Sequence, residues 1–364
     1  MKRRSFLAGA SVAGVAAAAT TLATPAIAQG KRDLKLVTTW PKNFPGLGTA
    51  AQRIVDNINA LTDGQLNVKL FAAGELVPPF QSFDAVAAGT ADMYHGAEYY
   101  WQGKSVAYNF FCTVPFGLTT DELNAWIYWG GGQELWDKLA KKDKIKGFIC
   151  GNTGVQMGGW FNKEINSLED LKGLKMRMPG LGGEVMRRLG VAVVNLPGGE
   201  IFPALQSGAI DATEWVGPWN DLAFGFYKVA KFYYYPGFHE PAPAQSLGIN
   251  LDVWESFTAT QKSIIQTVCM AENSRAHAEF NAKNGDALDT LLKKHGVQLK
   301  RFSDEVLAAI GTASGEVIAG LANADEITKE VVASFLANRK NAIAWSRLAE
   351  ESYFAARRLN FKYG

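Results

Sequence analysis

The sequence predicts an α/β protein with two lobes and a helical C-terminal region that packs across both. The chain has 364 residues, 48% of them hydrophobic, so it is longer than one compact domain usually is. Strand-like and helix-like stretches alternate through the first 250 residues. After about residue 255 the apolar residues recur at helical spacing.

The first lobe begins with a strand, a helix and a second strand. Residues 34–39 and 66–71 have strand patterns, and residues 49–62 place apolar side chains at helical spacing up to Gly64. This order is typical of a βαβ unit, whose strands are parallel. A further helix and a further strand follow at residues 79–88 and 91–94.

The second lobe is predicted from strand-like stretches separated by short helices. One of these helices spans residues 200–206 and is ended by Gly208. From about residue 255 we expect helices to the end of the chain. The strand-like stretches of this lobe lie at residues 147–149, 157–161, 174–178, 191–195 and 211–216.

The domain division follows from this pattern. No internal repeat or Pro-rich linker separates the lobes, so we expect the chain to cross between them more than once. Ligands of open α/β sheets bind at the carboxyl ends of strands, which makes the cleft between the lobes the expected site. The predicted parts are an export peptide at 1–28, a first lobe at 29–150, a second lobe at 151–250 and a helical region contributing to both lobes at 251–364.

The N-terminus has the pattern of a removable export peptide. Lys2, Arg3 and Arg4 precede a weakly apolar stretch that ends in a small-x-small cleavage pattern at residues 26–28. Arg3-Arg4 followed by Ser-Phe-Leu matches the twin-arginine signal, which exports folded proteins. An uncleaved anchor helix is the less favoured alternative, because Ala, Gly and Thr replace Leu and Ile poorly in lipid. We expect a periplasmic mature protein with no further membrane span.

Composition and missing motifs exclude several functions. The 37 basic and 35 acidic residues give a net charge of +2 without a long run of either sign, so nucleic acid is not an expected partner. A phosphate loop is missing, and residues 180–185 have Val185 where a dinucleotide fingerprint needs glycine. The three cysteines show no C-x-x-C spacing and predict buried thiols. They are Cys112, Cys150 and Cys269.

Catalytic motifs are missing too. There is no G-x-S-x-G elbow, and the four histidines stand apart without metal-ligand spacing. We therefore expect a protein that is not an enzyme.

Four segments carry a resemblance to a known family. They are residues 74–90 with Gly-Glu-Leu-Val-Pro and Phe-Asp-Ala-Val, residues 171–177, residues 205–212 and the export peptide. In this order they resemble the extracytoplasmic binding proteins of tripartite ATP-independent periplasmic (TRAP) transporters. The resemblance covers essentially the whole chain. It implies a two-lobe periplasmic binding protein-like fold that captures a small organic acid anion and delivers it to membrane subunits of the transporter.

Two longer stretches resemble one subgroup of this family in particular. Residues 151–161 and 211–218 look like the subgroup that binds 2-oxo acids or lactate together with a metal cation. The implied ligand is a pyruvate-like or lactate-like monocarboxylate, and the implied cofactor is Na⁺ or Ca²⁺. A dicarboxylate, a sugar acid or a longer keto acid is the alternative ligand. A homodimer is a possible assembly.

Arg177 is the predicted carboxylate anchor. It follows a strand-like Leu-Lys-Met and precedes Pro179, so it lies at a strand end that faces the cleft. A planar guanidinium there holds a carboxylate by two parallel bonds, as the matching arginine does in the family. An arginine on a solvated rim is the alternative.

The resemblance also implies a cation site. Gln156 and Glu214 offer hard oxygens of the kind that Na⁺ and Ca²⁺ prefer. In the resembling subgroup both are ligands, and the main-chain carbonyl of Trp215 completes the set. A core glutamate paired with a lysine is the alternative for Glu214.

Further residues are expected around the ligand. Tyr99, Tyr100 and Asn152 match positions whose hydroxyl and amide groups bond the acid, and Trp215 and Trp219 could wall the pocket. Glu240 matches an acidic position of the subgroup that bears on the cation. The preceding residue, His239, stands where the family has a large aromatic residue.

The mechanism implied is binding without chemistry, in which residues of both lobes meet on the ligand when the cleft closes. The rival is a periplasmic lyase or isomerase with Glu214 as base and Arg177 as anchor.

Overall fold

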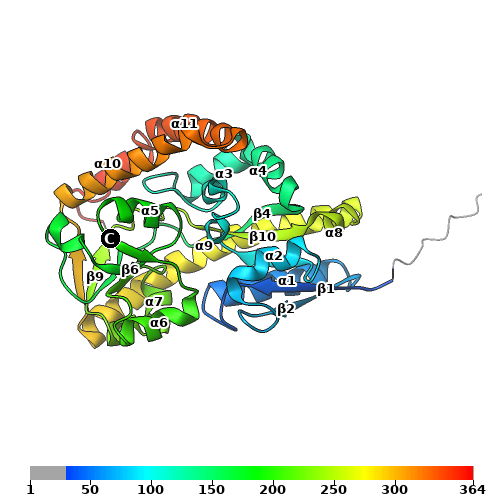
Figure 1. Ribbon diagram of the computed structural model, residues 1–364, viewed down its shortest axis with the longest axis horizontal. Coiled ribbons are helices and arrows are strands. Elements are labelled where there is room, and N and C mark those ends of the chain that lie inside the picture. Colours follow the sequence, from blue (N-terminus) through cyan, green and yellow to red (C-terminus); the bar gives the residue numbers. More distant parts are fainter. Residues whose placement is uncertain (1–29, 364) are drawn as a thin grey trace, which may run out of the picture.

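The computed structural model describes residues 30–363, and these form two β-sheets surrounded by helices (Figure 1). The predicted α/β fold class is confirmed. The predicted export peptide with Arg3 and Arg4 lies outside the described residues.

The first sheet has the strand order β2-β1-β3-β10-β4. Strand β1 runs parallel to β2 and β3, as the predicted βαβ unit requires, whereas β10 runs antiparallel to β3 and β4. Helix α1 (Leu47–Leu61) joins β1 to β2 and buries its apolar face against the sheet. The strands are β1 (Arg32–Thr38), β2 (Leu66–Phe71), β3 (Met93–Gly96), β4 (Ile145–Asn152) and β10 (Ala244–Asn250).

The second sheet has the strand order β11-β9-β5-β8-β6-β7. Strand β6 is parallel to both β7 and β8, so the carboxyl ends of these three strands lie at the same edge of the sheet. Strand β5 is antiparallel to β8 and β9. The strands are β5 (Gly159–Phe161), β6 (Lys175–Arg177), β7 (Ala192–Val194), β8 (Ala212–Thr213), β9 (Phe232–Tyr235) and β11 (Gln298–Arg301).

Helix α9 (Ala259–His295) connects the two halves of the molecule (Figure 1). A capping box of Thr258 and Gln261 starts the helix, and Gly296 in the left-handed conformation ends it. Its first half packs Ile265 into the core of the first sheet, and its second half packs Phe280 into the core of the second. The helical C-terminal region therefore packs across both lobes, as predicted.

The remaining helices cover the faces and ends of the sheets. Helix α10 packs on α5, and α11 packs on α4, so these two long helices span one side of the molecule (Figure 1). The helices are α2 (Ser82–Ala87), α3 (Thr120–Trp129), α4 (Gly132–Ala140), α5 (Gly180–Arg188), α6 (Gly198–Gln206), α7 (Pro218–Phe224), α8 (Leu251–Glu255), α10 (Asp304–Gly320), α11 (Glu326–Ser346) and α12 (Glu350–Ala356). The short 3₁₀ segments are η1 (Pro79–Gln81), η2 (Glu98–Trp101), η3 (Val106–Phe111), η4 (Lys141–Asp143), η5 (Leu168–Leu171), η6 (Phe226–Lys228) and η7 (Leu321–Asn323).

Three details differ from the sequence prediction. Strand β11 interrupts the region expected to be wholly helical, because its four residues add an edge to the sheet beside β9. Strands β9 and β10 form where no strand was predicted, whereas α6 is followed by Gly208 in the left-handed conformation, as predicted. The segment Asp304–Asn323 is long and apolar enough to span a membrane by length and composition, with 28% of its apolar window buried.

The predicted division at residues 150 and 250 stays a prediction. The strand pairing adds one fact to it: β10 belongs to the first sheet although its residues fall within the predicted second lobe. The chain thus returns to the first sheet after forming most of the second.

Candidate ligand and cation site

Two parallel strands place Arg177 beside Glu214. Arg177 ends β6 and is paired with Thr213, which ends β8. Glu214 follows directly, and its backbone N–H donates to the Arg177 carbonyl at 3.2 Å. Because the strands are parallel, both side chains emerge at the carboxyl edge of the sheet, where open α/β sheets bind ligands.

Arg177 and Glu214 form an ion pair from which solvent is excluded. Arg177 Nη1 contacts Glu214 Oε1, and both side chains are 0% exposed. Arg177 Nε also donates to the Leu196 carbonyl at 3.1 Å, and the guanidinium lies over the Trp215 ring at 5.3 Å. Arg177 Nη2 is buried and has no hydrogen-bond partner among residues 30–363. This nitrogen can therefore donate to a bound carboxylate.

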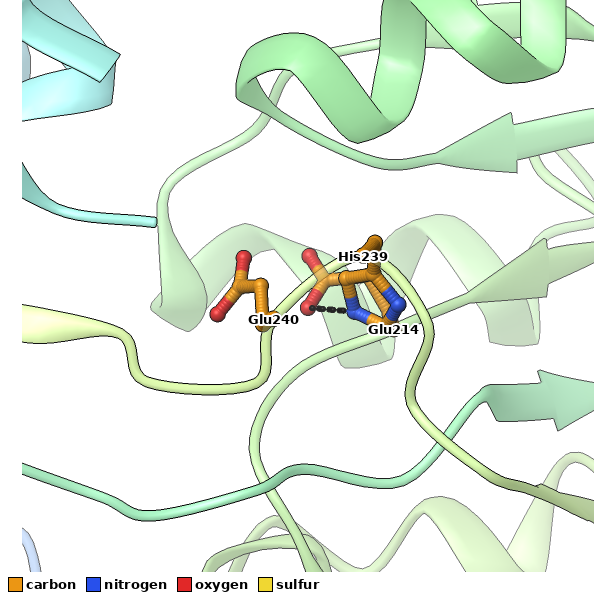
Figure 2. A group of neighbouring side chains, drawn as sticks. All are labelled: Glu214, His239 and Glu240. Carbon is orange, nitrogen blue, oxygen red and sulfur yellow. Dashed lines mark hydrogen bonds and ion pairs between the residues drawn. The ribbon is translucent and has the colours of Figure 1, made fainter. Parts of the chain in front are cut away.

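A loop between β9 and β10 adds two titratable side chains. His239 Nε2 lies 3.3 Å from Glu214 Oε2, and Glu240 follows in the chain. Figure 2 shows the carboxylates of Glu214 and Glu240 next to each other, with the His239 ring beside Glu214. One ligand atom from each of these three buried residues lies within 4.8 Å of the others. The spacing is close enough for one ion to be shared.

The Gln156 loop is held against the same cluster by the backbone. Gln156 N–H donates to the Glu240 carbonyl at 3.1 Å, and Gly237 N–H donates to the Gln156 carbonyl at 3.0 Å. Position 237 requires glycine, because a Cβ there would lie 2.3 Å from the Gln156 carbonyl oxygen. The Gln156 side chain donates to Thr153 Oγ1 at 3.1 Å, which leaves Gln156 Oε1 buried without a partner in the described chain.

The donor set suits a hard cation. Glu240 Oε2 and Gln156 Oε1 are both buried oxygens without a partner in the part of the chain that the structure describes. Burial raises the pKa of Glu240 well above its usual value, and the nearby charge of Glu214 raises it further. A cation among these oxygens would offset both effects, and carboxylate, amide and carbonyl oxygens are the ligands that Na⁺ and Ca²⁺ take. The residues present therefore fit such an ion.

Aromatic side chains from both sheets enclose a cavity next to this cluster. Its volume is about 10 Å³, roughly the space of one water molecule. Trp40 from the first sheet meets Trp215 from the second edge to face, with ring centres 6.2 Å apart. The lining residues are Trp40, Leu47, Ala97, Tyr99, Tyr100, Thr153, Gln156, Trp215, Val216, Pro243 and Gln245.

Tyr99 and Tyr100 lie in η2, which follows the central strand β3. The Tyr99 hydroxyl partly offsets the rise that burial causes in the pKa of Glu240, and Tyr100 packs on Trp40 with ring centres 6.2 Å apart. Burial raises the pKa of both tyrosines, so their hydroxyls are neutral donors at physiological pH.

Two predicted residues lie elsewhere. Asn152 Oδ1 accepts from Thr120 Oγ1 and from the Gly154 N–H, both at 2.9 Å, and Asn152 Nδ2 donates to the Ala242 carbonyl at 3.4 Å. These bonds hold the loop after β4. Trp219 packs on Phe280 and does not line the cavity. A direct role of Asn152 in binding ligand stays a prediction.

Sequence reasoning missed Trp40, Thr153 and Gln245, which all line the cavity. Trp40 follows β1 at the carboxyl edge of the first sheet, so the strand-end rule could have found it. His239 was noticed as a departure from the family, but its contact with Glu214 depends on a loop whose course the sequence does not reveal.

Comparisons with known proteins show the family of the chain. Residues 36–325 match the family of bacterial extracellular solute-binding proteins, family 7. A monocarboxylate 2-oxoacid-binding periplasmic protein of Nostoc is 43% identical over 97% of this chain and 98% of its own length.

Two solved structures are similar over nearly the whole chain. A TRAP periplasmic solute-binding protein of Pseudoalteromonas atlantica with bound sodium and pyruvate is 37% identical, with a TM-score of 0.87 over 91% of this chain and 100% of that one. A TRAP transporter solute-binding protein of Bordetella bronchiseptica, a dimer with calcium and picolinate in one site, is 35% identical, with a TM-score of 0.88 over 90% of this chain and 97% of that one.

Proposed function

This chain belongs to family 7 of the bacterial extracellular solute-binding proteins, and on that basis we propose that it captures a small 2-oxo or 2-hydroxy monocarboxylate, such as pyruvate, in the periplasm. It delivers the acid to the membrane subunits of a TRAP transporter. The observation that carries the proposal is Arg177, whose buried Nη2 has no partner in the described part of the chain and which is paired with Glu214 of the acidic cluster.

Charge balance supports an anion bound together with a cation. The Arg177–Glu214 pair is neutral as a unit, so an anion added alone would leave a net buried charge. A cation held by Gln156, Glu214, Glu240 and the Trp215 carbonyl would neutralise the carboxylate. The bound sodium and calcium of the two similar structures support Na⁺ or Ca²⁺ in this role. The ion supplies attraction to the acid, and the chain's own residues hold and orient both.

The cavity favours a monocarboxylate over the alternatives. Arg177, which packs on the lining residue Trp215, offers one cationic group beside the cavity, and none of the described lining residues carries a charge, so a second carboxylate would have no cationic partner. The small volume of the cavity, about 10 Å³, and its aromatic walls also favour a ligand of few carbons over a sugar acid.

The site is suited to binding and not to turnover. Glu214 is the residue that a lyase or isomerase would use as base, but its two oxygens already contact Arg177 and His239. The chain is therefore a receptor that releases its ligand unchanged.

Native mass spectrometry of protein purified from the periplasm without added ligand tests this function, with metal analysis of the same sample. We expect a 2-oxo or 2-hydroxy monocarboxylate and about one equivalent of Na⁺ or Ca²⁺. A co-purified sugar acid or dicarboxylate would contradict the ligand class, and conversion of added pyruvate during long incubation would contradict the receptor role.

The C-terminal segment supports a homodimer. Residues 345–363 expose large apolar side chains, of which Trp345 is 69% exposed and Tyr363 is 92% exposed. Exposed apolar surface of this extent is typical of an interface. The others in this segment are Leu348, Tyr353, Phe354, Leu359 and Phe361.

A complementary surface lies on the same chain. Helices α10 and α11 and residues 114–116 line a largely apolar cavity of about 620 Å³. Lys329 and Arg339 line it, whereas α12 begins with Glu350 and Glu351. We propose that the C-terminal segment of one copy lies in this cavity of a second copy, and reciprocally, so that both exposed surfaces are buried.

A further inference from the structure

His95 lies at the centre of the first sheet and outside the residues discussed so far. It belongs to β3, the middle of five strands, and its side chain is 0% exposed. It pairs with Thr38 on one side and with Leu247 on the other. A polar ring at such a position needs partners for both nitrogens.

Both nitrogens of His95 are hydrogen-bonded, and the partners fix its tautomer. Trp40 Nε1 lies 3.0 Å from His95 Nδ1, and an indole N–H can only donate. Nδ1 must therefore carry the lone pair. The proton then resides on Nε2, which donates to the Cys150 carbonyl at 3.1 Å. Burial lowers the pKa of His95 to about 4, so the ring stays neutral at physiological pH.

This bond determines the orientation of Trp40. The residue follows β1, and its carbonyl accepts from the Ala73 N–H at 3.0 Å, which anchors the backbone. The indole then extends from the first sheet to the cavity, where it packs against Tyr100 and Trp215. Trp215 comes from the second sheet and also packs over Arg177. Trp40 is thus a wall of the cavity that meets the other half of the molecule.

We propose that His95 is a positioning residue for ligand binding, which holds Trp40 in the orientation that closes the cavity against Trp215. The inference rests on the proposed function only for the choice of pyruvate as the probe. His95 acts through Trp40 and does not touch the ligand.

Two matched variants separate the two bonds of His95. In His95→Asn the side-chain oxygen can occupy the position of Nδ1 and accept from Trp40. In His95→Gln the amide nitrogen can occupy the position of Nε2 and donate to Cys150, but the acceptor for Trp40 is lost. Both variants replace the ring by a smaller amide in the same core, so a merely structural role would affect them similarly.

We expect His95→Asn to keep pyruvate affinity within about threefold and His95→Gln to lose about tenfold, as for one neutral hydrogen bond. Trp40→Phe should lose a similar factor, and adding His95→Gln to it should cost nothing more, because the bond is already gone. Calorimetry at saturating Na⁺ and Ca²⁺ measures each affinity. Equal losses in the Asn and Gln variants, or full affinity in Trp40→Phe, would overturn the proposal.

A second measurement does not depend on the ligand. Nitrogen NMR of the histidine rings in the wild-type chain should show the proton of His95 on Nε2 and none on Nδ1 down to about pH 5. A proton on Nδ1 would contradict the inferred tautomer. If wild type fails to bind pyruvate while this signature is present, the proposed function has failed and the Trp40–His95 bond has not.

Discussion

Arg177 and Glu214 form an ion pair in which neither side chain has any exposed surface. The proposed anchor for the ligand therefore also takes part in holding the fold together. Removing one member of such a pair leaves the other charge buried and unpaired, which typically costs about 3–5 kcal/mol. From the sequence alone, Arg177 would be expected to affect binding and not stability; the buried pair changes that expectation.

Replacement of Arg177 should affect binding and stability in different proportions. Arg177→Ala should abolish measurable pyruvate binding and lower the free energy of unfolding by about 3 kcal/mol or more, because Glu214 loses its counter-charge. Arg177→Lys keeps the charge but not the planar guanidinium. Its free energy of unfolding should therefore be close to that of the wild type, whereas its affinity for pyruvate should fall tenfold or more. Calorimetry and urea unfolding measure the two effects.

The control is Arg188→Ala on α5, whose side chain is 48% exposed and pairs with Glu316 on the surface. This substitution should change neither the free energy of pyruvate binding nor the free energy of unfolding by more than about 1 kcal/mol. Normal pyruvate binding in Arg177→Lys would show that the planar guanidinium is not needed and that Arg177 is not the carboxylate anchor.

The predictable part of the fold lies in elements with clear periodicity. Residues 66–71 were expected as a strand and form β2, because one face is buried and the other is not. Strand β10 was not recognised, since it is buried on both faces and its sequence Ala-Gln-Ser-Leu-Gly-Ile-Asn shows no alternation. Strand β11 is too short for a pattern of its own.

The site shows a similar limit. Arg177 and Glu214 are 37 residues apart, and their contact depends on the parallel register of β6 and β8, which strand-end reasoning can anticipate. The approach of His239 to Glu214 depends on the loop between β9 and β10, and the bond between Trp40 and His95 depends on neighbouring strands of the first sheet. Local sequence patterns predict neither of these two contacts.

The cation and the acid should bind with reciprocal linkage, each increasing the affinity of the other by the same factor. After chelation and exchange into buffer free of Na⁺ and Ca²⁺, pyruvate affinity should fall by at least about tenfold, or roughly 1.4 kcal/mol. Adding back one of the two ions should restore it. Identical calorimetric affinities with and without cations would show that no cation binds together with the acid at this site.

Gln156 tests the cation ligands without breaking the Arg177–Glu214 pair. Gln156→Met keeps the length of the side chain but removes Oε1, so the added ion should restore less affinity than in the wild type. Gln245→Met is the matched control, because Gln245 lines the same cavity and its side-chain amide donates to the Pro243 carbonyl at 2.7 Å. Equal restoration in both variants would exclude Gln156 as a ligand.

Glu98 should make the stability of the chain depend on pH. Its side chain is 0% exposed, and Oε1 accepts from Tyr94 at 2.7 Å and Ser246 at 2.6 Å. Burial raises the pKa of Glu98 to about 7. A raised pKa in the folded state gives stability that is fully present below the unfolded pKa of about 4.5 and is lost as pH rises through about 7.

Glu98→Gln cannot ionise and should escape this loss. Its free energy of unfolding relative to wild type should therefore increase by about 3 kcal/mol between pH 4.5 and pH 8, whatever the constant cost of the new amide. Contributions of His95 and Asp221 cancel in the difference between the two proteins. Glu184→Gln, at a side chain that is 42% exposed, is the control. Parallel stability curves for wild type and Glu98→Gln would show that Glu98 does not titrate in this range.

Deletion of residues 347–364 should convert a dimer into a monomer. Leu348, Tyr353, Leu359 and Tyr363 are each more than half exposed on their own chain, and only burial in a partner would remove this apolar surface from water. Light scattering coupled to size exclusion should give about 2 chains per particle for the full mature protein and 1 for the truncated one. Pyruvate affinity should stay unchanged, because the deleted segment does not line the ligand cavity.

Ala333→Asp separates loss of the dimer from loss of the segment itself. Ala333 is exposed and lines the larger cavity between α10 and α11, so a charge there should exclude the C-terminal segment of a partner while leaving that segment intact. The variant should be monomeric. In a mixture with the truncated chain, the segment of the variant can still enter the cavity of the truncated chain, so at most one of the two reciprocal exchanges can form. A dimeric Ala333→Asp chain would place the interface elsewhere. A monomeric full-length protein that co-floats with lipid vesicles would instead assign the apolar C-terminal segment to a membrane surface. The long apolar stretch of α10 is a second reason to measure vesicle binding in the same experiment.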